Sequence, residues 1–388
     1  MNKNRITQMK FTQLLRCAAL IPLMAFASIT TANDNLSSSL LSIWHKFAVG
    51  AVFTQTNDSE GNEVLMFSRH GNGKLQFLDA FATDGVGTSG GLGNQGALAL
   101  SKDNDFLFVV NAGSNEITTF SVHKHGLKLV DKVPSGGERP ISLSVFQDRL
   151  YVLNTGSDSI NGFTFDHDGK LTPMAEAIRS LSGTETSAAQ IQVSPWGDAL
   201  VVTERATNLI DVFWLDDNGI PGEAVISPSV GTTPFGFDFD RRGHLVVSEA
   251  AGGADNASSV SSYNILETGQ LEIISGAVPT TESAACWLIT TPNGRFAYTT
   301  NTRSSSISGF RIERDGSLNL LDLDGVTGNT GEGTNPLDMA MSRNGRHLYA
   351  ISPATEEIVA FRIRGNGSLK NIQSVTAAAP RINGLAAY

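Results

Sequence analysis

Two glutamates occupy the same place in two similar stretches of the chain. Glu204 ends "ALVVTE" and Glu249 ends "HLVVSE", where related stretches carry Asn154 and Asn301. Two carboxylates close together in a concave site can raise the pKa of one of them and provide a general base. With the two Asn side chains they could also hold a divalent cation such as calcium through oxygen ligands. The alternative is structural, with each carboxylate accepting hydrogen bonds from N–H groups of nearby turns.

Three further side chains are candidates for holding a ligand. Trp287 could stack on a ring-shaped ligand such as a sugar or an aromatic acid, or it could pack in the core. Gln190 and Asp338 stand at matching places of their segments and could hydrogen-bond the same ligand, or bond to water in a buried channel. Apart from the divalent cation, nothing indicates a cofactor, because the sequence has no phosphate-binding glycine loop and no CxxCH haem motif.

Arginines could contact an anion or an oxyanion, because a guanidinium group pairs well with carboxylates. The candidates are Arg139, Arg205, Arg303 and Arg381. The alternative for each is a surface counter-charge in an acidic protein. We place Arg381 in the catalytic group with the two glutamates, and we expect Arg139 and Arg205 to contact the ligand.

A repeated unit must position these residues. The residue that follows the second predicted strand of a unit, called here the marker residue, recurs at intervals of 43 to 52 residues, and the marker residues are Asn111, Asn154, Glu204, Glu249, Asn301 and Ser352. Each unit contains four short strands joined by turns such as "PNGR" and "ERDGSL", whose Gly, Asn and Asp residues supply the positive φ angles of tight hairpins. A period of this length with several strands per unit is the signature of a β-propeller.

The repeat therefore predicts an all-β fold, a seven-bladed β-propeller with four-stranded blades. The first unit, from about Phe47 to Ala82, lacks an inner strand, and we expect a C-terminal strand within Ala379–Tyr388 to close the ring by pairing with this N-terminal blade. A run of separate β-sandwiches is the alternative. Propellers bind ligands at one mouth of the central channel, and strand phase places the starts of the inner strands and the marker residues near its axis.

The first 32 residues have the pattern of a secretory signal peptide. Four basic residues accompany an apolar stretch from Cys17 to Ile29, and cleavage is expected after Ala32. A membrane anchor is the alternative, which the short apolar stretch and Pro22 disfavour. We expect residues 33–388 to form a single propeller domain that is periplasmic or secreted. Its one cysteine, Cys286, excludes an intrachain disulfide.

Removal of this segment makes the chain more acidic, because it leaves 24 Lys and Arg against 38 Asp and Glu. A strongly acidic balance disfavours nucleic acid and anionic membranes as partners. We expect a monomer whose partner is a small molecule.

One sequence frame resembles that of a known family. It reads "P-x-x-[apolar]-x-[apolar]-S-x-[DN]-G-R-x-[apolar]-Y" followed by "N-x-x-[ST]-x-x-I-x-x-[FY]", and it is clearest in Ala285–Leu318. It resembles the lactonase-type seven-bladed propellers, the family of bacterial 6-phosphogluconolactonase and the carboxymuconate-lactonizing enzyme, over essentially all of residues 33–388. Members of the family typically open an inner strand with Pro-Arg-His. None of the seven corresponding triplets here contains His, and only Arg381 matches the Arg.

The resemblance implies an exported lactonase-like hydrolase or cyclase that acts on a small cyclic ester, a sugar or muconate-type lactone, or on the related sugar acid. The reaction would take place at the channel mouth, with Glu204 or Glu249 as base and Arg381 as electrophilic partner. The missing His favours the alternative, a non-catalytic propeller that binds a ligand or a protein.

Overall fold

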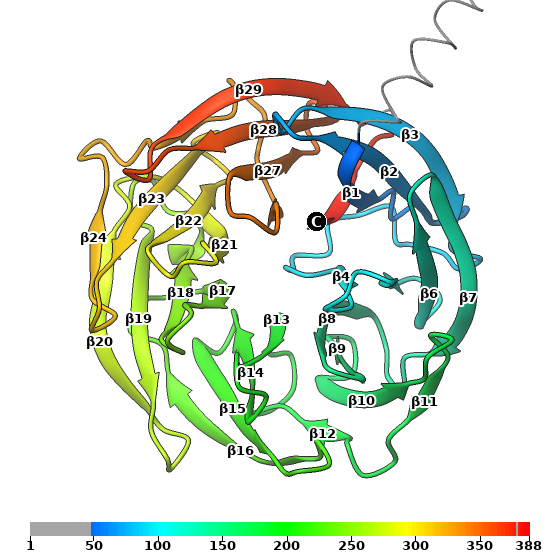
Figure 1. The fold of residues 1–388 in the computed structure, drawn as a ribbon. Helices are drawn as coiled ribbons and strands as arrows, with labels where there is room; N and C mark the ends of the chain where they lie inside the picture. Colours follow the sequence, from blue (N-terminus) through cyan, green and yellow to red (C-terminus); the bar gives the residue numbers. More distant parts are fainter. Residues whose placement is uncertain (1–47, 378) are drawn as a thin grey trace, which may run out of the picture. The chain divides into compact units, whose positions relative to one another are not determined.

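The computed structural model describes residues 48–377 and 379–388, which form a ring of seven antiparallel sheets (Figure 1). Each sheet is a blade whose four main strands run outward from the central channel, in sequence order except in the first blade, where the last strand of the chain is innermost. The seven-bladed all-β fold predicted from the repeat is therefore confirmed. The predicted signal peptide, residues 1–32, and the segment 33–47 lie outside the described residues.

The strands are short, as the spacing of turn residues predicts. The first two blades contain β30 (Asn383–Ala387), β1 (Ala48–Gln55), β2 (Glu63–His70) and β3 (Leu75–Ala82), then β4 (Leu98–Leu100), β5 (Phe106–Asn111), β6 (Glu116–His123) and β7 (Gly126–Pro134). The third blade contains β8 (Pro140–Phe146), β9 (Arg149–Asn154), β10 (Ser159–Phe165), β11 (Leu171–Pro173) and the two-residue β12 (Arg179–Ser180).

The remaining blades repeat this order. The fourth and fifth contain β13 (Ala188–Val193), β14 (Ala199–Glu204), β15 (Leu209–Leu215) and β16 (Pro221–Pro228), then β17 (Pro234–Phe239), β18 (Leu245–Glu249), β19 (Ser259–Ile265) and β20 (Leu271–Pro279). The sixth and seventh contain β21 (Ala285–Thr290), β22 (Phe296–Asn301), β23 (Ser306–Ile312), β24 (Leu318–Leu320) and β25 (Gly328–Asn329), then β26 (Met339–Met341), β27 (His347–Ser352), β28 (Glu357–Ile363) and β29 (Leu369–Thr376).

The chain closes its own ring, as predicted. β30 is the innermost strand of the first blade and pairs antiparallel with β1, with Val52 opposite Ala387. The Tyr388 N–H donates to the Ala51 carbonyl at 3.0 Å, and the Arg69 Nε donates to the Tyr388 carbonyl at 2.7 Å. Pairing the last strand with the first blade leaves no unpaired inner edge at the junction of the two ends.

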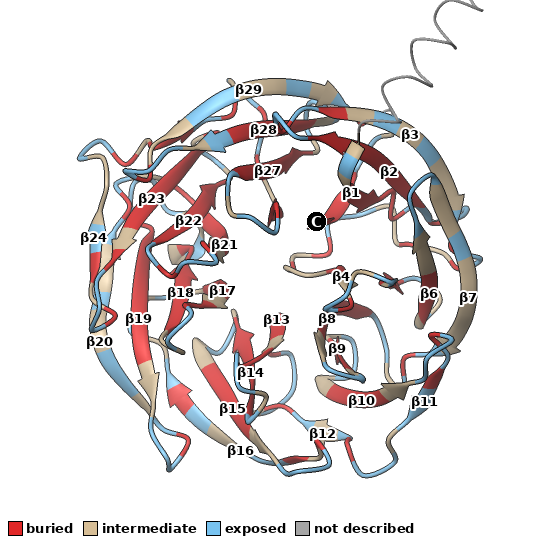
Figure 2. Ribbon diagram, in the orientation of Figure 1, coloured by how far each residue is buried: buried red, intermediate tan, exposed pale blue. Residues whose placement is uncertain are grey.

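The core lies between the faces of neighbouring blades. Figure 2 shows burial concentrated on the inner and middle strands, while the outer strands alternate. In the seventh blade all six residues of β27 are buried, whereas β29 has four exposed positions among eight. A tyrosine of the second strand fastens one blade to the next through its hydroxyl. Tyr151 donates to the Gly219 carbonyl at 2.7 Å, and Tyr298 donates to the Gly367 carbonyl at 2.7 Å.

Helix is nearly absent from the described residues, where the one helical element is a single 3₁₀ turn at Ala251–Gly253. Within the same part of the chain no helix is long and apolar enough to cross a membrane.

Candidate functional site at the channel mouth

The register of the strands defines two ends of the ring. In the fourth blade Ala188 of β13 lies opposite Glu204 of β14 at one end, and the turn of residues 194–198 joins the same strands at the other. Inner strands begin at the first end, called here the mouth end. The hairpin turns between first and second and between third and fourth strands lie at the second, called the turn end.

Glu204 is fully buried at the mouth end, within its own blade. Its carboxylate accepts the Ser182 N–H at 3.0 Å, the Ser182 hydroxyl at 2.5 Å and the Thr207 hydroxyl at 2.5 Å. Asp211 lies beside it, and burial followed by the charge of Glu204 raises the pKa of Asp211 to about 8. Burial and the neighbouring charge therefore favour the neutral form of the Asp211 carboxyl.

Glu249 is equally buried and even better supplied with donors. It accepts the Gly231 N–H at 2.9 Å, the Ser261 hydroxyl at 2.6 Å and the Ser259 hydroxyl. A Cβ placed on Gly231 would lie 2.2 Å from a carboxylate oxygen, so the interblade segment can approach the carboxylate only because that residue is glycine. The carboxylate thus ties the connection between two blades to the end of β18.

The marker residues do not line the channel, which corrects the expectation drawn from strand phase. They end the second strands, whose side chains face the neighbouring sheet and the interblade segment rather than the axis. Asn154 bonds to Asn161 at 3.3 Å, and Asn301 bonds to Ser308 at 2.8 Å, each inside its own blade. Among the described residues no three His, Cys, Asp or Glu side chains are grouped so that they could hold a metal ion.

A cavity of about 180 Å³ lies on the axis of the ring. Residues from all seven blades line it, namely Gln95, Gly96, Leu143, Gln190, Ile191, Gln192, Asp238, Ile289, Asp338, Met339 and Leu385. Two predicted ligand contacts, Gln190 and Asp338, are among them. Gln190 binds the next blade through two hydrogen bonds. Its amide accepts the Phe237 N–H at 2.7 Å and donates to the Phe237 carbonyl at 2.8 Å.

The two acidic residues of the channel wall differ from the glutamates. Burial raises the pKa of Asp338 well above its ordinary value, although the N–H groups of Gly96 and Gly384 oppose this shift. One Asp338 carboxyl oxygen, Oδ2, is buried and has no hydrogen-bond partner among the described residues. Burial also raises the pKa of Asp238, which accepts the Thr290 N–H at 2.8 Å.

The segment Gly91–Gly96, called here the plug, crosses the channel at its mouth end. Figure 1 shows this connection between β3 and β4 reaching into the centre of the ring. The Gln95 amide accepts the Leu288 N–H at 2.8 Å and donates to the Leu288 carbonyl at 2.6 Å, from the second blade to the sixth. The Asn94 amide donates to the Ile141 carbonyl of the third blade.

Three predicted ligand contacts hold this plug. Trp287 is 4% exposed, packs 4.9 Å from the Phe235 ring, and donates its indole N–H to the Asn94 carbonyl. Arg139 donates to the Gly91 carbonyl at 3.4 Å. The guanidinium of Arg205 lies 5.1 Å from the Phe235 ring centre, and burial lowers its pKa. Arg205 also lies against the plug, since a Cβ on Gly93 would be 3.0 Å from its guanidinium. The three side chains therefore meet at one place, but what they contact there is the plug and not a ligand.

A second pocket, of about 330 Å³, opens at the mouth end and is called here the mouth pocket. Its walls are the loop of residues 89–91, Leu337, residues 353–354 and residues 381–383. Arg381 is exposed there, so its guanidinium is available to a ligand. Asn383 is 3% exposed, and the oxygen of its side-chain amide, Oδ1, is buried without a partner among the described residues. The mouth pocket thus combines one exposed cation with largely apolar walls.

The sequence singled out Arg381 but missed Asn383, Asp238 and the role of Gln95. Asp238 carried a readable signal, because it is a charged residue inside "PFGFDF", an otherwise apolar inner strand. Asn383 carried none, because an Asn beside Gly384 reads as an ordinary turn residue.

The family profile described as "Lactonase, 7-bladed beta-propeller" matches residues 60–184 and 178–286. The chain belongs to this lactonase family of seven-bladed propellers. Among solved structures, the periplasmic gluconolactonase of Pseudomonas aeruginosa is similar, with 19% identity, a TM-score of 0.66, and coverage of 87% of this chain and 98% of that one. A protein of Bacteroides uniformis proposed to be a 6-phosphogluconolactonase has 17% identity, a TM-score of 0.70, and coverage of 88% and 100%.

At these identities the solved lactonase-type structures support the fold alone. No curated protein matches the sequence. None of the seven inner-strand triplets of this chain contains His. A lactonase activity of this family member would therefore have to use other residues.

Proposed function

We propose that this chain is an exported hydrolase that opens a small lactone of the sugar or muconate type in the mouth pocket. One observation carries the proposal. Arg381, an exposed cation, lines a recess of about 330 Å³ at the channel mouth of a lactonase-family propeller. The carbonyl oxygen of a lactone is an acceptor for the guanidinium.

The chemistry assigned to Arg381 is electrostatic. Water adds to the lactone carbonyl carbon, negative charge develops on the carbonyl oxygen, and the ring C–O bond then breaks to give an open hydroxy acid. A guanidinium beside that oxygen stabilises the developing charge more strongly than the uncharged ground state. Apolar walls such as Leu337 strengthen the interaction by limiting the access of water.

Proton transfer is assigned to Asp338 rather than to the glutamates considered first. Glu204 and Glu249 are saturated by donors of their own blades and of the interblade segments, so neither carboxylate has an oxygen left for water. Asp338 follows Leu337 of the mouth pocket, lines the channel beneath it, and keeps one unpaired oxygen. In its ionised form it takes the proton of the attacking water and returns it to the ring oxygen.

Export to the periplasm or the medium is part of the proposal. The pattern of residues 1–32 supports it, and a similar structure is that of a periplasmic gluconolactonase. Cell fractionation with an antibody against the chain tests it, and recovery of the full-length chain in the cytoplasm would contradict it.

The test is a pH-stat assay of the mature protein over a panel of sugar and muconate-type lactones. Acid release is expected, with Arg381→Gln lowering kcat/KM about a hundredfold. The matched control is Arg303→Gln, because Arg303 is an exposed arginine near the same end that pairs with Asp255 at 3.3 Å outside the pocket. Equal turnover by both variants would overturn the role of Arg381.

A non-catalytic propeller that binds a ligand or a protein is the second candidate. The plug across the channel and the lack of His at the seven triplets favour it. It predicts saturable binding of a panel member by calorimetry with no acid release, and any turnover that Arg381→Gln abolishes would exclude it.

A further inference from the structure

The turn end of the ring has a pocket between the fourth and fifth blades, far along the strands from the mouth pocket. This pocket, of about 160 Å³, is lined by Trp196, Trp214, Asp198, Asn264 and Arg242, among others. Pockets for drug-sized ligands measure roughly 300–1,000 Å³, so this one suits a group the size of a single ring. It is called here the tryptophan pocket.

Its chemistry is that of a sugar site. Trp196 is 61% exposed, and one edge of its ring rests on Gly243, where a Cβ would lie 1.9 Å away. The indole N–H of Trp214 is buried and lacks a hydrogen-bond partner among the described residues. Aromatic faces take the C–H side of a sugar ring, while Asp198 and Asn264 offer acceptors for its hydroxyls.

A run of arginines leads away from this pocket across the fifth and sixth blades. Arg241, next to Arg242 of the pocket, packs on the turn of the sixth blade, where a Cβ on Gly294 would lie 2.4 Å from its side chain. Arg295 and Arg311 both lie over the Phe296 ring, at 5.2 and 5.4 Å.

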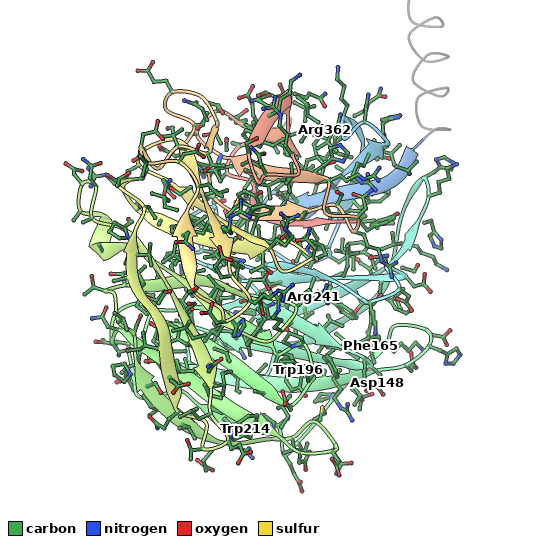
Figure 3. The ribbon with its side chains drawn as sticks, turned by 60° about the vertical axis from the view of Figure 1, so that its left-hand side comes forward. Asp148, Phe165, Trp196, Trp214, Arg241 and Arg362 are labelled. Atoms are coloured by element: carbon green, nitrogen blue, oxygen red, sulfur yellow. The ribbon has the colours of Figure 1, made fainter. Side chains whose placement is uncertain are left out.

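The run continues onto the seventh blade. The Phe296 ring lies against Gly367, where a Cβ would be 2.6 Å away, and this glycine closes the turn that begins at Arg364. Burial is the main cause that lowers the pKa of His347 on this blade. The positive charges of Arg69, from the first blade, and of Arg362 and Arg346, from the seventh, lower it further. In Figure 3 the labelled Trp214, Trp196, Arg241 and Arg362 follow one another from the bottom of the view to the top.

The arginines of the seventh blade have no acidic partner. Arg343, Arg346, Arg362 and Arg364 are exposed, and none forms an ion pair within residues 48–377 and 379–388. Apart from the buried Asp338 of the channel wall, the acidic residues of this blade are Glu356 and Glu357, which precede and begin β28 at the mouth end. Arg242, at the pocket end of the run, does pair with Asp240 at 3.5 Å, so the unpaired cations are those of the seventh blade. In an acidic protein, unpaired cations gathered at one end mark a binding surface for an anion.

We infer that the turn end binds a strand of acidic polysaccharide, with one sugar ring in the tryptophan pocket and carboxylates of the following sugars on the arginine run. The pocket by itself fits any small ring, and the arginines by themselves fit any polyanion. The pocket and the arginines form one continuous surface through Arg242, Arg241 and Gly294. A ligand that fits the whole surface is a polymer with both sugar rings and negative charges. The site is independent of the proposed lactone hydrolysis at the mouth end.

The test measures binding of polygalacturonate to the mature protein by biolayer interferometry. Arg346→Gln/Arg362→Gln is expected to weaken binding at least about tenfold, since each guanidinium donates charge-assisted hydrogen bonds to the polymer carboxylates. Trp196→Ala is expected to weaken it about fivefold and Trp196→Phe to restore most of the affinity. The control Lys102→Gln/Lys128→Gln removes the same charge from the second blade and is expected to bind normally.

Three comparisons separate this proposal from its competitors. Fully methyl-esterified polygalacturonate keeps the rings and lacks the charges, and polyaspartate keeps the charges and lacks the rings, so both are expected to bind weakly. Equal binding of polyaspartate, of single-stranded DNA or of anionic vesicles would overturn the proposal, as would full binding by Trp196→Ala. Absence of any binding to polygalacturonate would also overturn it. Lactone turnover by all these variants is expected to match the unmodified protein.

Discussion

Two sets of buried carboxyl groups in this propeller look alike in sequence and differ in the structure. Glu204 and Glu249 end second strands and accept hydrogen bonds from hydroxyls and N–H groups of their own blades and of the interblade segments. Asp238 and Asp338 line the axial cavity, and Asp338 keeps an unpaired oxygen. A carboxylate whose lone pairs are all taken holds the structure together, as Asp238 does too through Gln192 and Thr290, whereas Asp338 keeps an oxygen without a partner among the described residues.

The largest expected effect of a substitution on stability at neutral pH comes from removing a saturated carboxylate. Glu249→Gln puts an amide N–H₂ among donors, so we expect the free energy of unfolding to fall by about 2–4 kcal/mol. Urea denaturation followed by circular dichroism measures it, with the exposed Glu223→Gln as the control of the same chemical change. The folded fraction is expected to keep full lactone turnover, and loss of turnover at unchanged stability would return Glu249 to the catalytic site.

The pair of Glu204 and Asp211 makes the stability depend on pH. The pKa of Asp211 is raised to about 8 in the folded chain, from an ordinary value near 3.8. The folded state therefore holds the proton more tightly, and this contribution is complete below pH 4 and is lost as the pH rises through 8. The slope reaches at most about 1.4 kcal/mol per pH unit.

Asp211→Asn removes this titration. Between pH 4 and 8 the midpoint of urea denaturation of the unmodified protein is expected to fall more steeply than that of the variant. Parallel curves for the two proteins would show that Asp211 titrates alike in the folded and unfolded states.

The plug allows a comparison between two glutamines with the same hydrogen bonds, and the expected effect on stability is of intermediate size. Gln95→Ala removes two hydrogen bonds to the Leu288 backbone and is expected to cost about 1–3 kcal/mol. The matched control is Gln373→Ala, because Gln373 makes the same pair of bonds to the Leu75 backbone at the outer strands. Only Gln95→Ala is expected to shift the fluorescence of the covered Trp287, and equal spectra would mean that the plug stays in place without Gln95.

Asp338→Asn is expected to have the smallest effect on stability, within about 1 kcal/mol at pH 7, because it removes a buried group whose pKa is already raised. The same variant is expected to lose lactone turnover. The turnover of the unmodified protein should rise with pH as Asp338 ionises, since its raised pKa leaves it protonated at low pH. Full turnover by Asp338→Asn would remove Asp338 from the mechanism.

Much of the architecture was readable from local patterns. The marker residues Asn111 to Ser352 do end the second strands β5, β9, β14, β18, β22 and β27, because turn glycines and alternating apolar residues are local signals. Pairing of β30 with β1 was predictable because the C-terminal segment contains one strand with no further strands after it, while the first blade lacks an inner strand. The direction of the marker side chains was not readable, because both the channel and the interblade segment adjoin the end of a second strand.

The candidate site was readable only in part, and the reason is distance along the chain. Arg381 was found because it stands alone as the family's Arg in an inner-strand triplet. The bond between Gln95 and Leu288 joins residues 193 positions apart, and no periodic pattern indicates that a loop will cross the channel. Trp287, Arg139 and Arg205 all contact the plug in the structure, and that contact depends on the crossing.

By itself the sequence determined the number of blades, the strands of each blade and the closure of the ring, because turns and alternation act over a few residues. The tertiary structure decided which carboxyl groups face the axis, where the arginines of separate blades meet, and which side chains the plug covers. Those outcomes depend on how seven separate hairpin units pack around one axis, and no single unit contains that information.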